Sequence, residues 1–74
     1  MSIQTGDIVQ PFEEMFNSFK NLYFKGSYST DLWFVTKQEP VGGVTMTHLR
    51  NMSTGSTMKL TCANKLFTKA SETK

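Results

Sequence analysis

The chain has one cysteine and one histidine among its 74 residues. Cys62 therefore has no partner within the chain for a disulfide bond, and Cys62 with His48 falls short of the four protein ligands that a structural zinc site needs. Small domains often depend on disulfides, metals or a partner chain for stability. We therefore expect no metal and no cofactor, and stability must come from packing or from a partner.

Long hydrophobic runs are also missing. Every apolar stretch is far shorter than the ~20 residues that a membrane-spanning helix needs. Residues 1–7 lack the basic start and following apolar run of a secretory signal. These absences predict a soluble, cytoplasmic protein with no membrane partner.

Catalytic motifs are missing as well. His48 and Cys62 are the only unusually reactive side chains, and no motif supplies the orienting group or oxyanion site that nucleophilic catalysis needs. Glu13 and Glu14 are adjacent, so they lie about 100° apart on a helix and do not converge as an acid and base pair. We predict that the protein is not an enzyme. At 74 residues it is expected to form one small domain, residues 1–74.

The apolar pattern predicts one helix. Phe12, Phe16, Phe19 and Tyr23 recur at helical spacing, Pro11 suits a helix start and Gly26 a helix end. We expect a helix over residues 12–24, with Phe12 and Phe16 buried.

The remaining segments predict short strands. Residues rich in β-branched or aromatic side chains, or alternating in polarity, occupy 7–10, 31–37, 44–48, 57–62 and 66–69. Turns are expected at 39–43, 52–56 and 63–65, with a positive φ at Gly55 and a bulge near Leu49 and Met52. The fold class is therefore α+β, mostly β: a small antiparallel SH3-like barrel or curled sheet, with one helix inserted after the first strand.

Three segments together resemble SH3-like barrels of the KOW and Tudor type. They are Gly6-Asp7-Ile8-Val9, Trp33-Phe34-Val35, and the hairpin from Val44-Thr45-Met46 to Met58-Lys59-Leu60 about Thr54-Gly55. The helix between the first two strands departs from that pattern. The resemblance implies a non-catalytic domain that binds RNA, DNA, ribosomes, RNA polymerase or peptide segments. The size and outline also resemble small phage-encoded accessory proteins.

Large apolar side chains are abundant: six Phe, two Tyr, one Trp and five Met. One small barrel does not bury all of them, and exposed aromatic and methionine side chains are typical of protein-interaction surfaces. We predict a partner-binding surface formed by Tyr23, Phe24, Tyr28 and Trp33. The leading hypothesis is a regulator or inhibitor that docks on a larger protein, such as a nucleic-acid-processing machine or host enzyme, and modulates its activity.

Two alternatives remain open. The formal charge is +2, and a basic set could bind RNA or DNA directly with weak sequence selectivity, while Trp33 or Tyr28 stacks on bases. This set is Lys37, Arg50, Lys59, Lys65 and Lys69. The second alternative is a structural homo-oligomer that pairs through the helix stripe or an open sheet edge.

Overall fold

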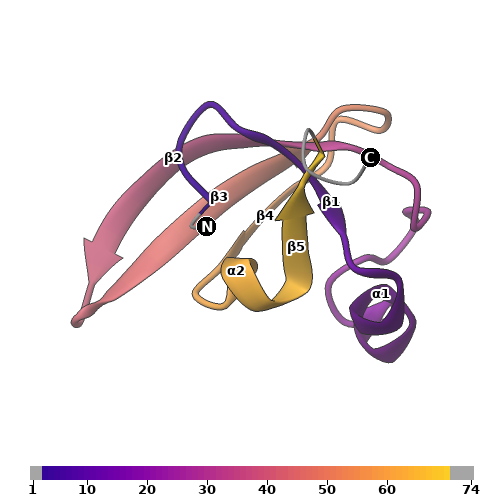
Figure 1. Ribbon diagram of the computed structural model, residues 1–74, viewed down its shortest axis with the longest axis horizontal. Helices are drawn as coiled ribbons and strands as arrows, with labels where there is room; N and C mark the ends of the chain where they lie inside the picture. Colours follow the sequence, from indigo (N-terminus) through magenta and orange to yellow (C-terminus); the bar gives the residue numbers. More distant parts are fainter. Residues whose placement is uncertain (1–2, 71–74) are drawn as a thin grey trace.

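The computed structural model describes residues 3–70. Its elements are β1 (Ile8–Pro11), α1 (Glu13–Phe19), β2 (Trp33–Val41), β3 (Val44–Asn51), β4 (Thr57–Leu60), α2 (Ala63–Leu66) and β5 (Phe67–Lys69). The strands form one antiparallel sheet in the order β4-β3-β2-β1-β5, and β5 runs steeply across the direction of β2 and β3 (Figure 1). The predicted class, α+β and mostly β, is confirmed.

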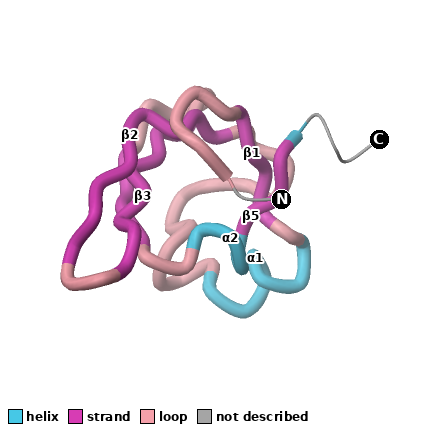
Figure 2. Tube along the Cα trace, turned by 60° about the vertical axis from the view of Figure 1, so that its left-hand side comes forward, coloured by secondary structure: helices cyan, strands magenta, loops and turns pink. Residues whose placement is uncertain are grey.

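The sheet is not closed into a barrel, so of the two predicted forms, a barrel or a curled sheet, the barrel is wrong. β4 and β5 are the two edges of the sheet, and they are only 4 and 3 residues long. The segment between them forms α2 instead of the expected plain turn, and its buried side chains Ala63 and Leu66 help to cover the core. Both helices lie on the same side of the arch that the strands form (Figure 2).

The predicted helix is present after the first strand, but it ends at Phe19 rather than Phe24. The backbone N–H groups of Leu22 and Tyr23 both donate to the carbonyl of Phe19, which closes a turn at this point. Past that turn the helical period no longer decides which side chains face inward. Phe24 consequently points into the core and is 1% exposed. The expected exposure of Phe24 is therefore wrong, and Phe12, expected to be buried, is 42% exposed.

Strand β2 places Trp33 and Val35 on the core side and Phe34 on the opposite side, because successive side chains alternate across a strand. Trp33 is 2% exposed, so its predicted exposure is also wrong. Its buried indole N–H has no hydrogen-bond acceptor among residues 3–70. Its ring meets those of Phe24 and Phe67 edge to face, with centroids 6.4 and 6.0 Å away.

The β2–β3 hairpin is longer than expected. Residues 39–41 continue β2, and the turn is reduced to Gly42 and Gly43, whose φ values of 58° and 86° suit a two-residue hairpin. Pro40 is tolerated because it lies beyond the part of β2 that pairs with β1. The register shift lies in β2, between Val35 and Lys37, so the expected bulge falls beside Leu49 but on the neighbouring strand, and not at Met52.

Candidate functional site

One face of the sheet is left uncovered by the helices, and we call it the outer face. The strand register places Ile8 opposite Phe34, Phe34 opposite Arg50, and Arg50 opposite Thr57. These four residues form a row across β1, β2, β3 and β4. Directly opposite side chains in an antiparallel sheet lie about 5 Å apart at Cβ, so the row is continuous.

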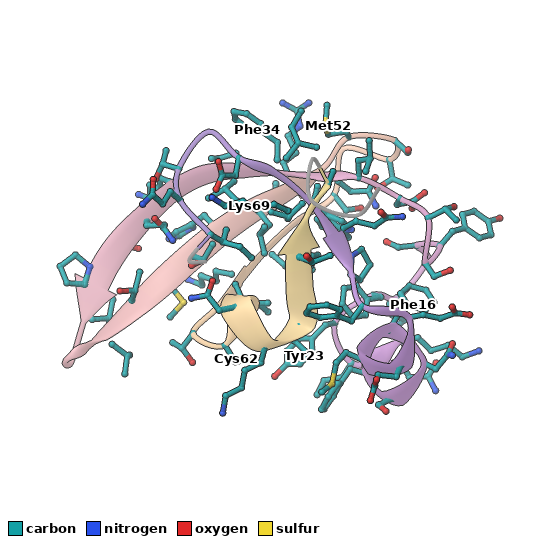
Figure 3. All side chains as sticks on the ribbon, in the orientation of Figure 1. Phe16, Tyr23, Phe34, Met52, Cys62 and Lys69 are labelled. Atoms are coloured by element: carbon teal, nitrogen blue, oxygen red, sulfur yellow. The ribbon has the colours of Figure 1, made fainter. Side chains whose placement is uncertain are left out.

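Four large apolar side chains form an outer apolar patch around this row. Ile8 is 41% exposed, Leu32 37%, Phe34 37% and Met52 53%. The backbone N–H of Met52 donates to the carbonyl of Leu32 at 2.9 Å, which ties the end of β3 to the start of β2. Phe34 and Met52 lie side by side on the side of the ribbon away from α1 (Figure 3). Contiguous exposed apolar area of this kind marks interaction surfaces.

A depression of about 460 Å³ lies at one end of the patch. Its walls include the apolar side chains of Phe34 and Met52 and the cationic side chain of Arg50. The β3–β4 turn completes it with Ser53 and Thr54, whose hydroxyl groups can donate or accept hydrogen bonds. The depression therefore combines an apolar wall, a positive charge and neutral polar groups.

The turn that carries Met52 is fixed by Asn51, which is fully buried. Its Oδ1 accepts hydrogen bonds from the backbone N–H groups of Ser53 and Thr54, at 2.7 and 2.9 Å. Its Nδ2 donates to Asp31 Oδ2 at 3.1 Å. A satisfied buried polar network of this kind holds its surroundings in one conformation, so Met52 is presented from a rigid turn.

The predicted nucleic-acid-binding residues divide between the two sides of the molecule. Lys37, Arg50 and Lys59 belong to the outer face, because Lys37 and Lys59 each pair with His48 and Arg50 pairs with Phe34. We call these three the outer cations. Lys65 lies in α2, on the other side of the sheet, and Lys69 forms an ion pair with Asp7 at 3.5 Å.

Glu39 and His48 form a close pair on the outer face, with Nε2 of His48 2.7 Å from Oε2 of Glu39. The pKa of Glu39 lies below its ordinary value, mainly because of the hydrogen bond to His48 and then because of the positive charge of Lys37. Lys59 contributes in the same direction. The hydrogen bond to His48 and the nearby positive charges thus favour the ionised form of Glu39.

The predicted partner-binding residues do not form one surface. Tyr28 is 73% exposed, as expected, whereas Phe24 and Trp33 are core residues. Tyr23 is half-buried and packs against Phe19, with ring centroids 5.5 Å apart. It lies on the opposite side of the molecule from Phe34 (Figure 3).

The residues of the outer apolar patch were not among the predicted site residues. The side chains of the strand predicted at 31–37 alternate between its two faces, so burying Trp33 requires Phe34 to face outward. This alternation could have identified Phe34 as a surface residue. The alternation alone does not say which of the two phases is buried. The larger ring of Trp33 and its pairing with Val9 settle the phase in the structure.

Within residues 3–70, no three His, Cys, Asp or Glu side chains gather closely enough to hold a metal ion. The helices in that range are too short to cross a membrane. No protein-family model matches the chain, and no curated protein or solved structure matches it either.

Proposed function

We propose that the protein is a non-catalytic binding module that docks on a larger protein through its outer face and modulates the activity of that protein. The observation that carries the proposal is the outer apolar patch, which lies on a sheet face that neither α1 nor α2 covers. Aromatic, methionine and arginine side chains are enriched at the centres of protein interfaces. Phe34, Met52 and Arg50 supply all three.

The proposed class of partner follows from the sequence resemblance to SH3-like domains of the KOW and Tudor type. A nucleic-acid-processing machine or another host enzyme fits that resemblance, as does an origin as a phage-encoded accessory protein. We place the action in the cytoplasm, where a lone thiol such as Cys62 stays reduced.

Affinity capture with matched variants tests the proposal. The wild-type protein and the variants Phe34→Ser and Leu22→Ser are each immobilised on a resin. Each resin is then incubated with a lysate of the cells that make the protein. Leu22 is the control because it is 68% exposed but follows α1, away from the outer face. We expect one stoichiometric partner that Phe34→Ser loses and Leu22→Ser retains. Capture that both variants retain, or both lose while folded, would contradict the proposal.

A second candidate function is direct binding of single-stranded RNA or DNA. It is favoured by Phe34, an exposed aromatic ring on the central strand of the sheet, which lies opposite Arg50 and on the same face as Lys37 and Lys59. Bases stack on such rings while cations contact phosphates. In this case log affinity falls with log salt by roughly 0.7 per phosphate contacted. Titration of a labelled oligonucleotide at several salt concentrations distinguishes this candidate from protein docking.

A further inference from the structure

Positively charged side chains outnumber negatively charged ones on the outer face. Lys37, Arg50 and Lys59 project from three adjacent strands, and Glu39 is the one carboxylate on this face among the described strand residues. Glu39 is already engaged by His48 at 2.7 Å. None of the outer cations has an ion pair with another residue in the range 3–70. The face therefore offers positive charge that the fold does not neutralise.

Arg50 joins this positive charge to the apolar patch. It lies opposite Phe34 in the strand register, and both line the depression of about 460 Å³ with Met52. A guanidinium group binds a carboxylate through two parallel hydrogen bonds, and it does so best where neighbouring apolar groups exclude water. A ligand that fills the depression would thus place an apolar group and a carboxylate next to each other.

We propose that the outer face binds an extended partner segment that carries both apolar and acidic side chains on the side that faces the sheet. Its apolar side chains would cover Ile8, Phe34 and Met52, and its carboxylates would pair with Arg50 and Lys59. This inference rests on the proposed docking function and adds the chemistry of the partner. Charge complementarity across an interface supplies specificity and speeds association.

A second copy of the chain is a poor occupant of the same face. Two copies that pair through one patch are related by a two-fold axis, so each patch meets itself. Such an interface would gather the three outer cations of each copy against one Glu39 from each, and like charges brought together in an interface are unfavourable. A nucleic acid is also less suitable, because Ile8, Leu32 and Met52 present aliphatic groups rather than further stacking surfaces.

The test uses the full chain and synthetic peptides of about eight residues, long enough to cross the four strands at ~4.8 Å spacing. The probe carries leucine and glutamate in turn at every second position, with serine between them, so that both kinds of side chain face the protein in an extended conformation. It carries a fluorescent label for anisotropy measurements. The matched probes replace every glutamate by lysine, or every leucine by serine. A labelled oligothymidylate is the nucleic-acid probe. We expect the leucine and glutamate peptide to bind more tightly than the other three probes.

The protein variants are Arg50→Glu, Arg50→Gln and Leu22→Ser, each checked for an unchanged melting temperature. Arg50→Glu should weaken peptide binding by at least about tenfold, Arg50→Gln by less, and Leu22→Ser not at all. Equal binding of the glutamate and lysine peptides, tighter binding of the oligonucleotide, or indifference to Arg50→Glu would overturn the inference. If Phe34→Ser abolishes capture of the cellular partner while Arg50→Glu does not, the docking function stands and only the acidic character of the partner is wrong.

Discussion

Asn51 and Asp31 are joined inside the protein by a 3.1 Å hydrogen bond from Nδ2 to Oδ2, although 20 residues separate them in the sequence. The same carboxylate oxygen accepts the backbone N–H of Tyr28 at 3.0 Å. Asn51 thereby links the loop before β2 to the turn after β3. Both segments emerge beside the outer apolar patch, through Leu32 on one side and Met52 on the other.

Replacing Asn51 should destabilise the fold more than replacing any single partner. Asn51→Leu removes four side-chain hydrogen bonds and leaves the buried Asp31 with one fewer donor, so we expect a loss of about 2–3 kcal/mol in the free energy of unfolding. Ser27→Ala removes only the 3.2 Å bond to Ser27 Oγ and should cost about 1 kcal/mol. Urea denaturation measures both, and equal stability of Asn51→Leu and the wild type would refute the linking role.

Phe24 and Tyr28 should respond to truncation in opposite ways. The ring of Phe24 contacts Phe16 and Phe67 at centroid distances of 5.0 and 5.6 Å. Phe24→Ala should therefore cost about 3–5 kcal/mol, enough to unfold a domain of this size. Tyr28 is 73% exposed, so Tyr28→Ala should change stability by no more than about 0.5 kcal/mol. Thermal melts followed by circular dichroism give both values; a stable Phe24→Ala variant would show that this core contact is dispensable.

The contrast between these two residues shows what the sequence could predict. The period that joins Phe12, Phe16 and Phe19 correctly placed a helix after the first strand. It could not show that the chain turns at Phe19, because the residues that follow keep a helix-compatible spacing. The burial of Phe24 depends on the aromatic rings that tertiary packing brings to it, which local periodicity does not contain.

The carboxyl group of Glu39 should titrate below its ordinary pKa of 4.5. Because its folded pKa is lowered, the stability that it contributes is fully present above about pH 4.5 and is lost as the pH falls through the lowered folded pKa. His48→Ala should move the pKa back toward 4.5 by more than Lys37→Ala does, since the hydrogen bond to His48 is the larger cause. NMR titration of the side-chain carboxyl follows the shift. Lys20→Ala is the control, and an unchanged pKa in His48→Ala would contradict the assignment.

The hairpin turn should tolerate asparagine better than a β-branched residue. Gly42 has a φ of 58° and open space around the position of a Cβ, so the cost of a substitution is conformational rather than steric crowding. Asparagine visits the left-handed region more readily than valine. We expect Gly42→Val to cost about 1–2 kcal/mol and Gly42→Asn less. Denaturation midpoints compare the two, and equal losses would mean that backbone conformation does not control this turn.

The outer face was the part of the molecule that the sequence left least determined. The sequence indicates a basic set that includes Lys37, Arg50 and Lys59, but nothing in their spacing separates them from Lys65 and Lys69. The division depends on strand register, which the bulge between Val35 and Lys37 shifts by one position. The sequence places Met52 in a turn, as the structure does, but its place beside Phe34 follows only from the pairing of β2 with β3.

The pairing of β1 with β5 makes the first strand of the sheet depend on the last one. Val9 pairs with Lys69 and Pro11 with Phe67, and the backbone N–H of Ile3 donates to Asn64 across 61 positions of sequence. A nascent chain that has not yet been extended through Phe67–Lys69 lacks both the strand that covers β1 and the ring that packs on Trp33. A chain that lacks this segment therefore presents β1 as an open edge to neighbouring chains. A variant truncated before Phe67 should therefore aggregate more readily than the full chain.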